Sequence, residues 1–187
     1  MAESLILNKR YAKALFDLAD KSSEQVEEFY RDMTFVANVF SDNLSLQAIM
    51  KNYVIKSGKK KNIVRELFEG KISKPALEFI LFVIQKDRGR HLLGIALAYI
   101  EIYKEFKNIT TVILYTTEPA DDNTKNRIIS SIKQFTDKTV ELDNKIDKNL
   151  IGGFRLFFDG HLYDASLFTK FKKLNKSFSI NVYDKSL

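Results

Sequence analysis

The sequence predicts a mostly helical α+β protein, with an N-terminal six-helix bundle over residues 1–106 and a smaller α/β module with a β-hairpin over residues 107–187. Three observations lead to this prediction. Apolar residues recur with the helical period of 3.6 up to about residue 106. Beyond Asn108 the period changes to two, as in a half-buried strand. An Asp159-Gly160 pair lies between two strand-like runs and is typical of a two-residue hairpin turn.

The first three helices follow from apolar stripes and capping residues. The first helix is apolar over a wide arc that includes Tyr11, Leu15 and Leu18, and this width indicates that two partners pack against it. A second amphipathic stripe occupies residues 26–40. The Ser-Asp-Asn run at 41–43 then offers caps for a short third helix.

Three further helices complete the predicted bundle. Ser57 is the expected N-cap of the fourth helix, which ends at Gly70. The fifth opens at residues 73–75, because serine caps a helix and proline is tolerated in the first turn, and it extends to about Lys86. The sixth covers residues 91–106. Helices of this length, joined by short loops, form a compact bundle.

The second module begins with a strand over residues 109–117, which is rich in β-branched residues. Asp121 or Asp122 caps the helix that follows, and a short strand is expected at 140–142.

A two-residue turn at Asp159-Gly160 fixes the register of the hairpin. It places Phe158 opposite His161, Phe157 opposite Leu162, Leu156 opposite Tyr163, and Arg155 opposite Asp164, the last as a cross-strand charge pair. Ser166 is then the expected cap of a final helix, which has apolar residues on one side and lysines on the other, before a tail from about Ser177.

Composition excludes several classes of function. The chain has no cysteine, so it forms no disulfide, thiolate nucleophile or sulfur-based zinc site. Its longest apolar run, residues 79–84, is too short to span a membrane. The net charge of +6 is evenly spread, with 17 basic and 14 acidic residues in 1–106 and 13 and 10 in 107–187. Two clusters of basic residues, at 56–65 and at 170–176, are interpreted as solvated helix faces, as charge runs usually are, with a phosphate-binding patch as the alternative.

The adjacent glycines Gly152-Gly153 could bind a phosphate or shape the backbone. They lead into a strand rather than a helix N-terminus. We therefore expect them to allow a backbone conformation that other residues disfavour and to allow the close approach of another segment. The run at 57–60 lacks the P-loop pattern, and His91 and His161 have no metal-ligand spacing. No catalytic, cofactor-binding or metal-binding residue is predicted.

Two stretches resemble one known family. The run "RYAKALFDLA" at 10–19 and the run "KIDKNLIGGFRLFFDGHLYDASLFTKFKKL" at 145–174 are similar to the delta subunit of F-type ATP synthase, the counterpart of the mitochondrial oligomycin-sensitivity-conferring protein. The second run is the more specific, with its Gly-Gly, strand, turn and Asp-Ala-Ser helix start. The chain departs from the family pattern at Phe157 and in the order of Asp159-Gly160.

The resemblance implies a non-catalytic stator subunit that links the alpha/beta head to the b-type peripheral stalk, one copy per complex, without cofactors. It implies that the N-terminal domain binds the amphipathic N-terminal helix of an alpha subunit between the first and fifth helices. By this resemblance Tyr11, Ala14, Leu15 and Leu18 form one wall, and Phe79, Phe82 and Val83 form the other, with ordinary core positions as the alternative reading. Gly152, Gly153 and Ser166 would shape the contact with the b-type stalk.

The N-terminus carries no transit-like pattern, which favours a bacterial or plastid-encoded protein over an imported one. The expected location is the cytoplasmic face of the bacterial inner membrane, peripheral to it through the complex. The stromal face of the plastid thylakoid is the alternative. A basic nucleic-acid-associated accessory protein is the alternative function, and it rests on charge alone.

Overall fold

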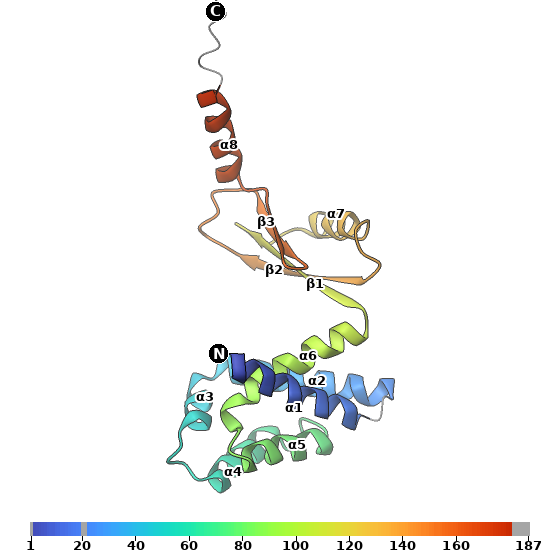
Figure 1. Ribbon diagram of the computed structural model, residues 1–187, viewed down its shortest axis with the longest axis vertical. Coiled ribbons are helices and arrows are strands. Elements are labelled where there is room, and N and C mark those ends of the chain that lie inside the picture. The colour runs from blue at the N-terminus through green and yellow to red at the C-terminus, as the bar shows by residue number, and fades with distance from the viewer. Residues whose placement is uncertain (1, 20–21, 181–187) are drawn as a thin grey trace, which may run out of the picture. The chain divides into compact units, whose positions relative to one another are not determined.

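The computed structural model describes residues 2–19 and 22–180 (Figure 1). The chain divides into two compact units, Met1–Lys107 and Asn108–Leu187, and each is described by itself. The predicted boundary after residue 106 lies one residue before this division. None of the helices in the described ranges is long and apolar enough to cross a membrane.

The N-terminal unit is built from helices packed around α6. Its elements are α1 (Ala2–Leu18), α2 (Ser23–Asp42), α3 (Leu44–Lys51), α4 (Ser57–Phe68), α5 (Lys74–Gln85), the short 3-10 turn η1 (Gly89–His91) and α6 (Leu92–Phe106). Helix α6 packs against both α1 and α2, and α4 packs against α5. Tyr99 of α6 is fully buried and donates a hydrogen bond from its hydroxyl to the Val26 carbonyl at 3.2 Å. The six predicted helices are confirmed.

The caps of these helices differ in detail from the predictions. Helix α4 begins at Ser57 and its N-cap is Lys56, so the predicted cap is wrong by one residue. Asn43 is the N-cap of α3, but its side chain donates back to the Val39 carbonyl rather than capping. Ser73 precedes α5, and both its backbone N–H and its hydroxyl donate to the Asp32 carboxylate, at 3.1 and 2.5 Å. Ser73 therefore ties the start of α5 to α2.

The C-terminal unit is a four-stranded mixed sheet with two helices. Its elements are β1 (Ile109–Thr116), α7 (Asp122–Ile132), β2 (Thr139–Ile146), β3 (Phe154–Phe158), β4 (His161–Asp164) and α8 (Leu167–Ile180). The strand order is β2-β1-β3-β4, with β1 and β2 parallel and the other pairs antiparallel. The C-terminal tail expected from about Ser177 begins inside α8, and residues 181–187 lie outside the described residues.

Strand β2 is longer than predicted, because it pairs with β1 along its whole length, from Thr139 opposite Ile109 to Ile146 opposite Thr116. It is an edge strand with mostly exposed side chains, so backbone pairing rather than an apolar pattern defines it. Helix α7 covers one face of the sheet. Its Ile132 packs with Val112 and Val140 in a buried cluster.

The hairpin has the predicted register at all four residue pairs. Asp159 and Gly160 both have positive φ, 46° and 77°, as the predicted turn requires. Arg155 lies opposite Asp164, as predicted, and its charge helps to lower the pKa of that carboxyl, but its guanidinium forms a salt bridge with Asp147 in the loop after β2. The Asp164 carboxylate instead accepts hydrogen bonds from residues at the start of α8.

Candidate helix-docking surfaces

An apolar groove lies between α1 and α5. It consists of two adjoining hollows of about 680 and 530 Å³, which share Phe82 as a lining residue. The first hollow is lined by Ile6, Leu7, Arg10, Tyr11, Ala14, Phe82 and Arg88, and the second by Leu18, Gln25, Phe29, Pro75, Glu78, Phe79 and Phe82. We call this pair of hollows the α1/α5 groove.

Large apolar side chains of the groove face solvent. Ile6 is 62% exposed, Leu18 59% and Phe82 48%. A contiguous exposed apolar surface of this kind is typical of an interaction site. The width of the apolar arc on α1 is thus explained: one side packs on α6, and the other forms a wall of the groove.

Five of the seven predicted groove residues line the groove: Tyr11, Ala14, Leu18, Phe79 and Phe82. The other two, Leu15 and Val83, are 0% exposed and belong to the core. No partner atom can touch them without opening the bundle, so they support the groove walls from beneath. For Leu15 the physical reason is the helical period. Leu15 follows Tyr11 by four positions, so it is rotated by about 40° around the helix axis, from the groove wall into the core.

Several groove residues were not predicted. Leu7 lies one turn before Tyr11 on the same stripe, and extending that stripe would have found it. Phe29 comes from α2 and reaches the groove only because α2 packs nearby, which no local pattern shows.

The groove is charged differently at its two hollows. Arg10 and Arg88 line the first, and Glu78 lines the second. The ammonium of Lys86 also lies 5.5 Å from the ring centroid of Phe82. A helix bound along the groove therefore meets positive charge at one end and negative charge at the other.

In the C-terminal unit, Gly152 and Gly153 lie against the start of α8. Gly153 has φ of +79°, and a Cβ at this position would lie 2.5 Å from the Ala165 carbonyl oxygen. A Cβ on Gly152 would lie 2.7 Å from Cδ1 of Leu167, whose backbone N–H donates to the Gly152 carbonyl at 3.0 Å. The expected close approach of another segment is confirmed.

Ser166 is the predicted cap of α8, and the structure confirms it. It is buried, and its hydroxyl oxygen accepts a hydrogen bond from the Thr169 N–H at 3.3 Å. Its own N–H donates to Asp164 Oδ1 at 2.8 Å, and the Thr169 hydroxyl donates to Asp164 Oδ2 at 3.0 Å. Hydrogen bonds from Ser166 are the main cause that lowers the pKa of the Asp164 carboxyl, with smaller contributions from Thr169 and Arg155.

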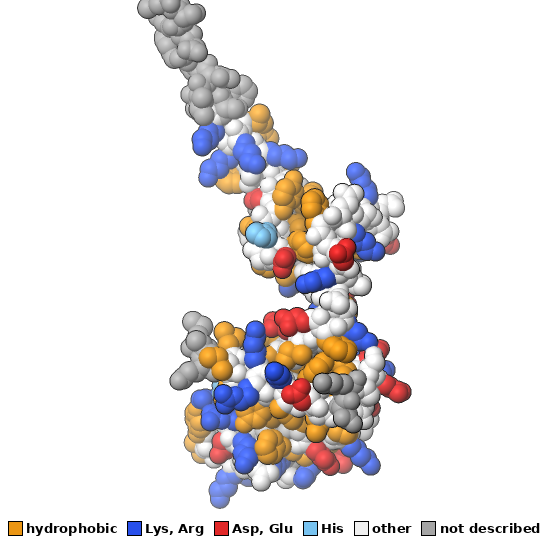
Figure 2. Space-filling view, turned by 45° about the vertical axis from the view of Figure 1, so that its right-hand side comes forward, with side chains coloured by type: hydrophobic (Ala, Val, Ile, Leu, Met, Phe, Trp, Pro, Cys, Tyr) orange, Lys and Arg blue, Asp and Glu red, His pale blue; other side chains and the backbone are white. Residues whose placement is uncertain are grey.

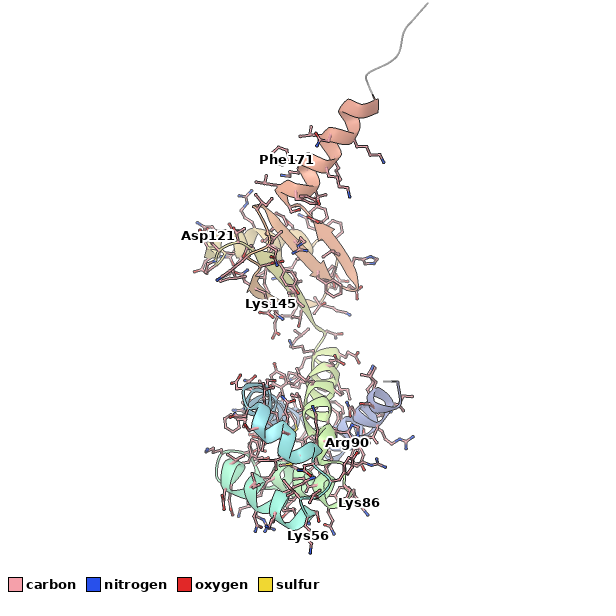
Figure 3. The ribbon with its side chains drawn as sticks, turned by 90° about the vertical axis from the view of Figure 1, so that its left-hand side faces the viewer. Lys56, Lys86, Arg90, Asp121, Lys145 and Phe171 are labelled. Atoms are coloured by element: carbon pink, nitrogen blue, oxygen red, sulfur yellow. The ribbon has the colours of Figure 1, made fainter. Side chains whose placement is uncertain are left out.

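Helix α8 presents an uncovered apolar stripe. Leu167, Phe168, Phe171 and Leu174 are between 40% and 63% exposed, and Lys170, Lys172, Lys173 and Lys176 are exposed on the same helix. Figure 2 shows these basic and hydrophobic side chains together around α8, and Figure 3 shows Phe171 projecting from it. The predicted amphipathic character of this helix is confirmed.

A further apolar hollow lies between α7 and strands β3 and β4 of the sheet. It measures about 680 Å³, and its apolar lining comes from Ile128, Ile132, Phe135, Phe154, Leu156, Phe158 and Tyr163. Phe154, Leu156 and Phe158 alternate along β3, so they point to the same face. No local pattern shows that α7 leaves this row of side chains partly uncovered.

The described residues contain no group of three or more His, Cys, Asp or Glu side chains that could hold a metal ion. The α1/α5 groove, the stripe on α8 and the hollow beside α7 are all apolar, which suits the docking of helices.

Comparisons with known proteins cover most of the chain. The sequence model of the family described as "ATP synthase delta (OSCP) subunit" matches residues 7–178. The chain is 30% identical over 170 residues to ATP synthase subunit delta of Clostridium beijerinckii, covering 91% of this chain and 94% of the relative, and equally to that of Clostridium botulinum. A chain of the Toxoplasma gondii mitochondrial ATP synthase hexamer has the same fold, with a TM-score of 0.69 at 20% identity, covering 92% of this chain and 97% of that one. The chain belongs to the ATP synthase delta (OSCP) subunit family, and it is a non-catalytic stator subunit that connects the catalytic head to the peripheral stalk.

Proposed function

We propose that this subunit holds the head and the stalk through two separate helix-docking surfaces, one on each unit. The α1/α5 groove binds the amphipathic N-terminal helix of an alpha subunit. The C-terminal unit binds the end of the b-type stalk helices through α8 and the hollow beside α7. One copy acts in each complex, at the cytoplasmic face of the bacterial inner membrane.

The observation that carries the proposal is the exposed apolar lining of the α1/α5 groove. A helix laid into a groove buries the side chains at positions i, i+3, i+4 and i+7, and the two adjoining hollows provide for such a row. Truncating a central anchor of such an interface costs at least about 2 kcal/mol, or about 30-fold in affinity. Phe82 holds the central position, because it lines both hollows.

The role of both surfaces is static. Rotation inside the head exerts torque on the ring of catalytic subunits, and the stator must resist it through contacts that do not slip. Apolar docking meets this requirement. Burial of apolar surface stabilises the contact, and the complementary shapes of the two surfaces fix the position of the bound helix.

The groove is tested by replacing Phe82 with serine. The matched control is Phe106→Ser, because Phe106 is also 48% exposed but lies at the end of α6, outside the residues that line the groove. Binding of the full chain to the N-terminal segment of its own alpha subunit is measured by fluorescence anisotropy. We expect at least a 30-fold loss for Phe82→Ser and less than a three-fold change for Phe106→Ser. Equal affinities of the two variants would refute the groove assignment.

A second variant, Tyr11→Asp, places a charge on the opposite wall. It is expected to weaken attachment to the head while leaving the fold intact, as measured by co-sedimentation with isolated heads and by circular dichroism. Normal co-sedimentation would count against the proposal.

The stalk surface is tested by Phe171→Asp. This variant should lose binding to the C-terminal segment of the b-type subunit and keep its affinity for the alpha segment. Phe82→Ser should show the reverse pattern, so each variant serves as the folding control for the other. A variant that binds neither the alpha segment nor the b-type segment has unfolded. If Phe171→Asp still binds both segments, α8 is excluded from the stalk contact.

A further inference from the structure

Helix α8 carries four lysines and no acidic residue between Leu167 and Ile180. The Asp164 carboxylate just before the helix accepts hydrogen bonds through both oxygens, from Ser166 and Thr169. The described residues therefore supply no counter-charge to the lysines, which are all exposed and form no ion pair with a described residue: Lys170, Lys172, Lys173 and Lys176. Charges of one sign beside an exposed apolar row are typical of a surface that meets an acidic partner.

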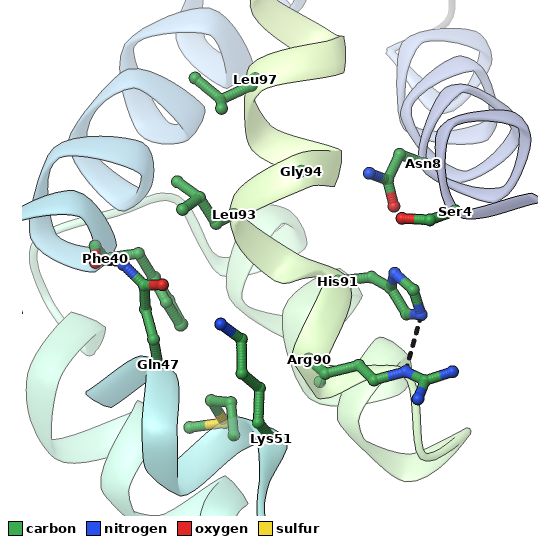
Figure 4. Close-up of a pocket in the computed structure, with 12 residues that line it drawn as sticks. Ser4, Asn8, Phe40, Gln47, Lys51, Arg90, His91, Leu93, Gly94 and Leu97 are labelled. Atoms are coloured by element: carbon green, nitrogen blue, oxygen red, sulfur yellow. Dashed lines mark hydrogen bonds between the residues drawn. The ribbon is translucent and has the colours of Figure 1, made fainter. Parts of the chain in front are cut away.

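Several basic residues elsewhere in the chain are held by neighbours. Arg90 donates from Nε to His91 Nε2 at 2.9 Å, as the close-up in Figure 4 shows. The ammonium of Lys60 donates to the Met50 carbonyl at 3.0 Å. Further pairs of this kind are Lys61 with Gln85, Lys125 with Asp122 and Arg155 with Asp147. The lysines of α8 have no such partner among the described residues, so they remain available to another molecule.

The apolar row of α8 has the spacing of a coiled-coil seam. Leu167, Phe171 and Leu174 follow one another at intervals of four and three positions, and each is at least 40% exposed. Such a row is narrower than the apolar face of a helix that packs on a globular core, and it matches one helix lying alongside. Phe168 borders the row on one side and Lys170 on the other.

The lysines take different places around the helix. Lys170 lies four positions before Leu174 and is rotated from it by about 40° around the axis, so it flanks the apolar row. Lys176 lies nine positions after Leu167 and is rotated from it by about 180°, so it lies on the opposite side of the helix. Lys170 is therefore the lysine placed for an ion pair with a helix packed on the row.

The start of α8 is fixed before any partner binds. Ser166 caps its first turn, and the Leu167 N–H donates to the Gly152 carbonyl at 3.0 Å. An apolar row that is already held in place loses little conformational freedom on binding, which favours affinity.

We propose that α8 pairs lengthwise with an acidic amphipathic helix, which the end of a b-type stalk subunit supplies. This pairing rests on the proposed stalk contact of α8 and specifies the chemistry of the partner. The apolar row of the stalk helix packs against Leu167, Phe171 and Leu174, and an aspartate or glutamate beside that row pairs with Lys170. The other lysines attract the acidic segment before contact and raise its association rate.

The test compares two charge reversals on the same helix of the full chain, Lys170→Glu and the matched control Lys176→Glu. Association and dissociation rates for the C-terminal segment of its own b-type subunit are measured by surface plasmon resonance. Wild-type affinity should fall at least about ten-fold between about 50 and about 500 mM salt, mostly through slower association. At a fixed salt concentration, Lys170→Glu should lower the affinity at least about ten-fold with faster dissociation, and Lys176→Glu less than about three-fold with slower association only. Circular dichroism of both variants should match the wild type.

A charge swap identifies the acidic partner of Lys170. Each Asp or Glu of the b-type segment is replaced singly by lysine, and one of these segments should bind Lys170→Glu more tightly than it binds the wild type. If no segment restores binding to Lys170→Glu, the ion pair at Lys170 is refuted.

The outcomes separate this pairing from the stalk role itself. No binding of the b-type segment at any salt concentration, with unchanged affinity for the alpha segment, would refute the stalk contact. Binding that is independent of salt, or equal losses in the two charge reversals, would keep the stalk contact and overturn the acidic pairing. Phosphatidylserine vesicles or a duplex oligonucleotide that bind as tightly as the b-type segment would also overturn it, because α8 would then bind any polyanion.

Discussion

Replacing Gly153 by alanine tests the close contact that positions α8. Gly153 has φ of +79°, and its Cβ would lie 2.5 Å from the Ala165 carbonyl oxygen and 3.0 Å from the Ser166 Cα. Both neighbours are backbone atoms, so the contact is not relieved by rotating a side chain. The strands and the start of α8 must move apart instead.

The cost has two parts that a second variant separates. A left-handed conformation costs an alanine roughly 1–2 kcal/mol, and forcing extra atoms into a packed site costs about 1–3 kcal/mol more. Gly160 has nearly the same φ, +77°, but no atom lies within 4 Å of its added Cβ. We therefore expect Gly153→Ala to destabilise the C-terminal unit by about 2–5 kcal/mol and Gly160→Ala by only about 1–2 kcal/mol.

The assay is native-state hydrogen exchange on the full chain, which reports the opening free energy of individual amides. The amides of β3 and of the first turn of α8 should lose protection in Gly153→Ala, while the helices of the N-terminal unit stay unchanged. Equal loss of protection in the two variants would refute the reasoning, because it would show that backbone strain alone determines the effect.

Three further changes have expected results. Asp32→Ala removes the acceptor of two hydrogen bonds from Ser73 and should lower the free energy of unfolding of the N-terminal unit by about 1.5–3 kcal/mol in urea denaturation; an unchanged midpoint would contradict this. Tyr99→Phe should cost about 1 kcal/mol in the same assay, since it loses one buried hydrogen bond while keeping the ring, and a larger loss would mean that the hydroxyl does more than pair with a carbonyl. The pKa of Asp164 is lowered in the folded protein, so its contribution to stability is present above its ordinary pKa of 3.8 and is lost as the pH falls below that value through the folded pKa. Exchange protection at the start of α8 should therefore fall in this acid range, and Asp164→Asn should remove that pH dependence; the same acid profile in the variant would assign it to another group.

Helix positions and the hairpin register could be predicted because both follow from local chemistry. The apolar stripes place the six helices, and the Asp159-Gly160 turn sets which residues of β3 and β4 face each other. The salt bridge of Arg155 to Asp147 was not predicted, because facing positions bring two side chains near, but hydrogen bonds decide which carboxylate the guanidinium contacts. Both oxygens of Asp164 accept hydrogen bonds, from the Ser166 N–H and the Thr169 hydroxyl. Asp147 accepts from the Asn149 N–H through Oδ1 and contacts Arg155 through Oδ2.

The candidate groove was also predicted only in part from the sequence. Periodicity marks Tyr11, Leu15 and Leu18 as apolar positions of one helix, but it does not tell a groove wall from a core position. Packing of α6 beneath α1 buries Leu15 and leaves Leu18 at the surface.

The sequence by itself determined the two units, the elements within each and the resemblance to a family, because period, caps and turn residues act over a few neighbouring positions. Only the tertiary structure shows which apolar side chains are exposed to a partner and that Arg155 forms its salt bridge with Asp147. It also shows that Gly152 and Gly153 lie against the start of α8, where a larger residue would clash. These outcomes depend on distances between segments that are remote in the chain, and no local pattern encodes such distances.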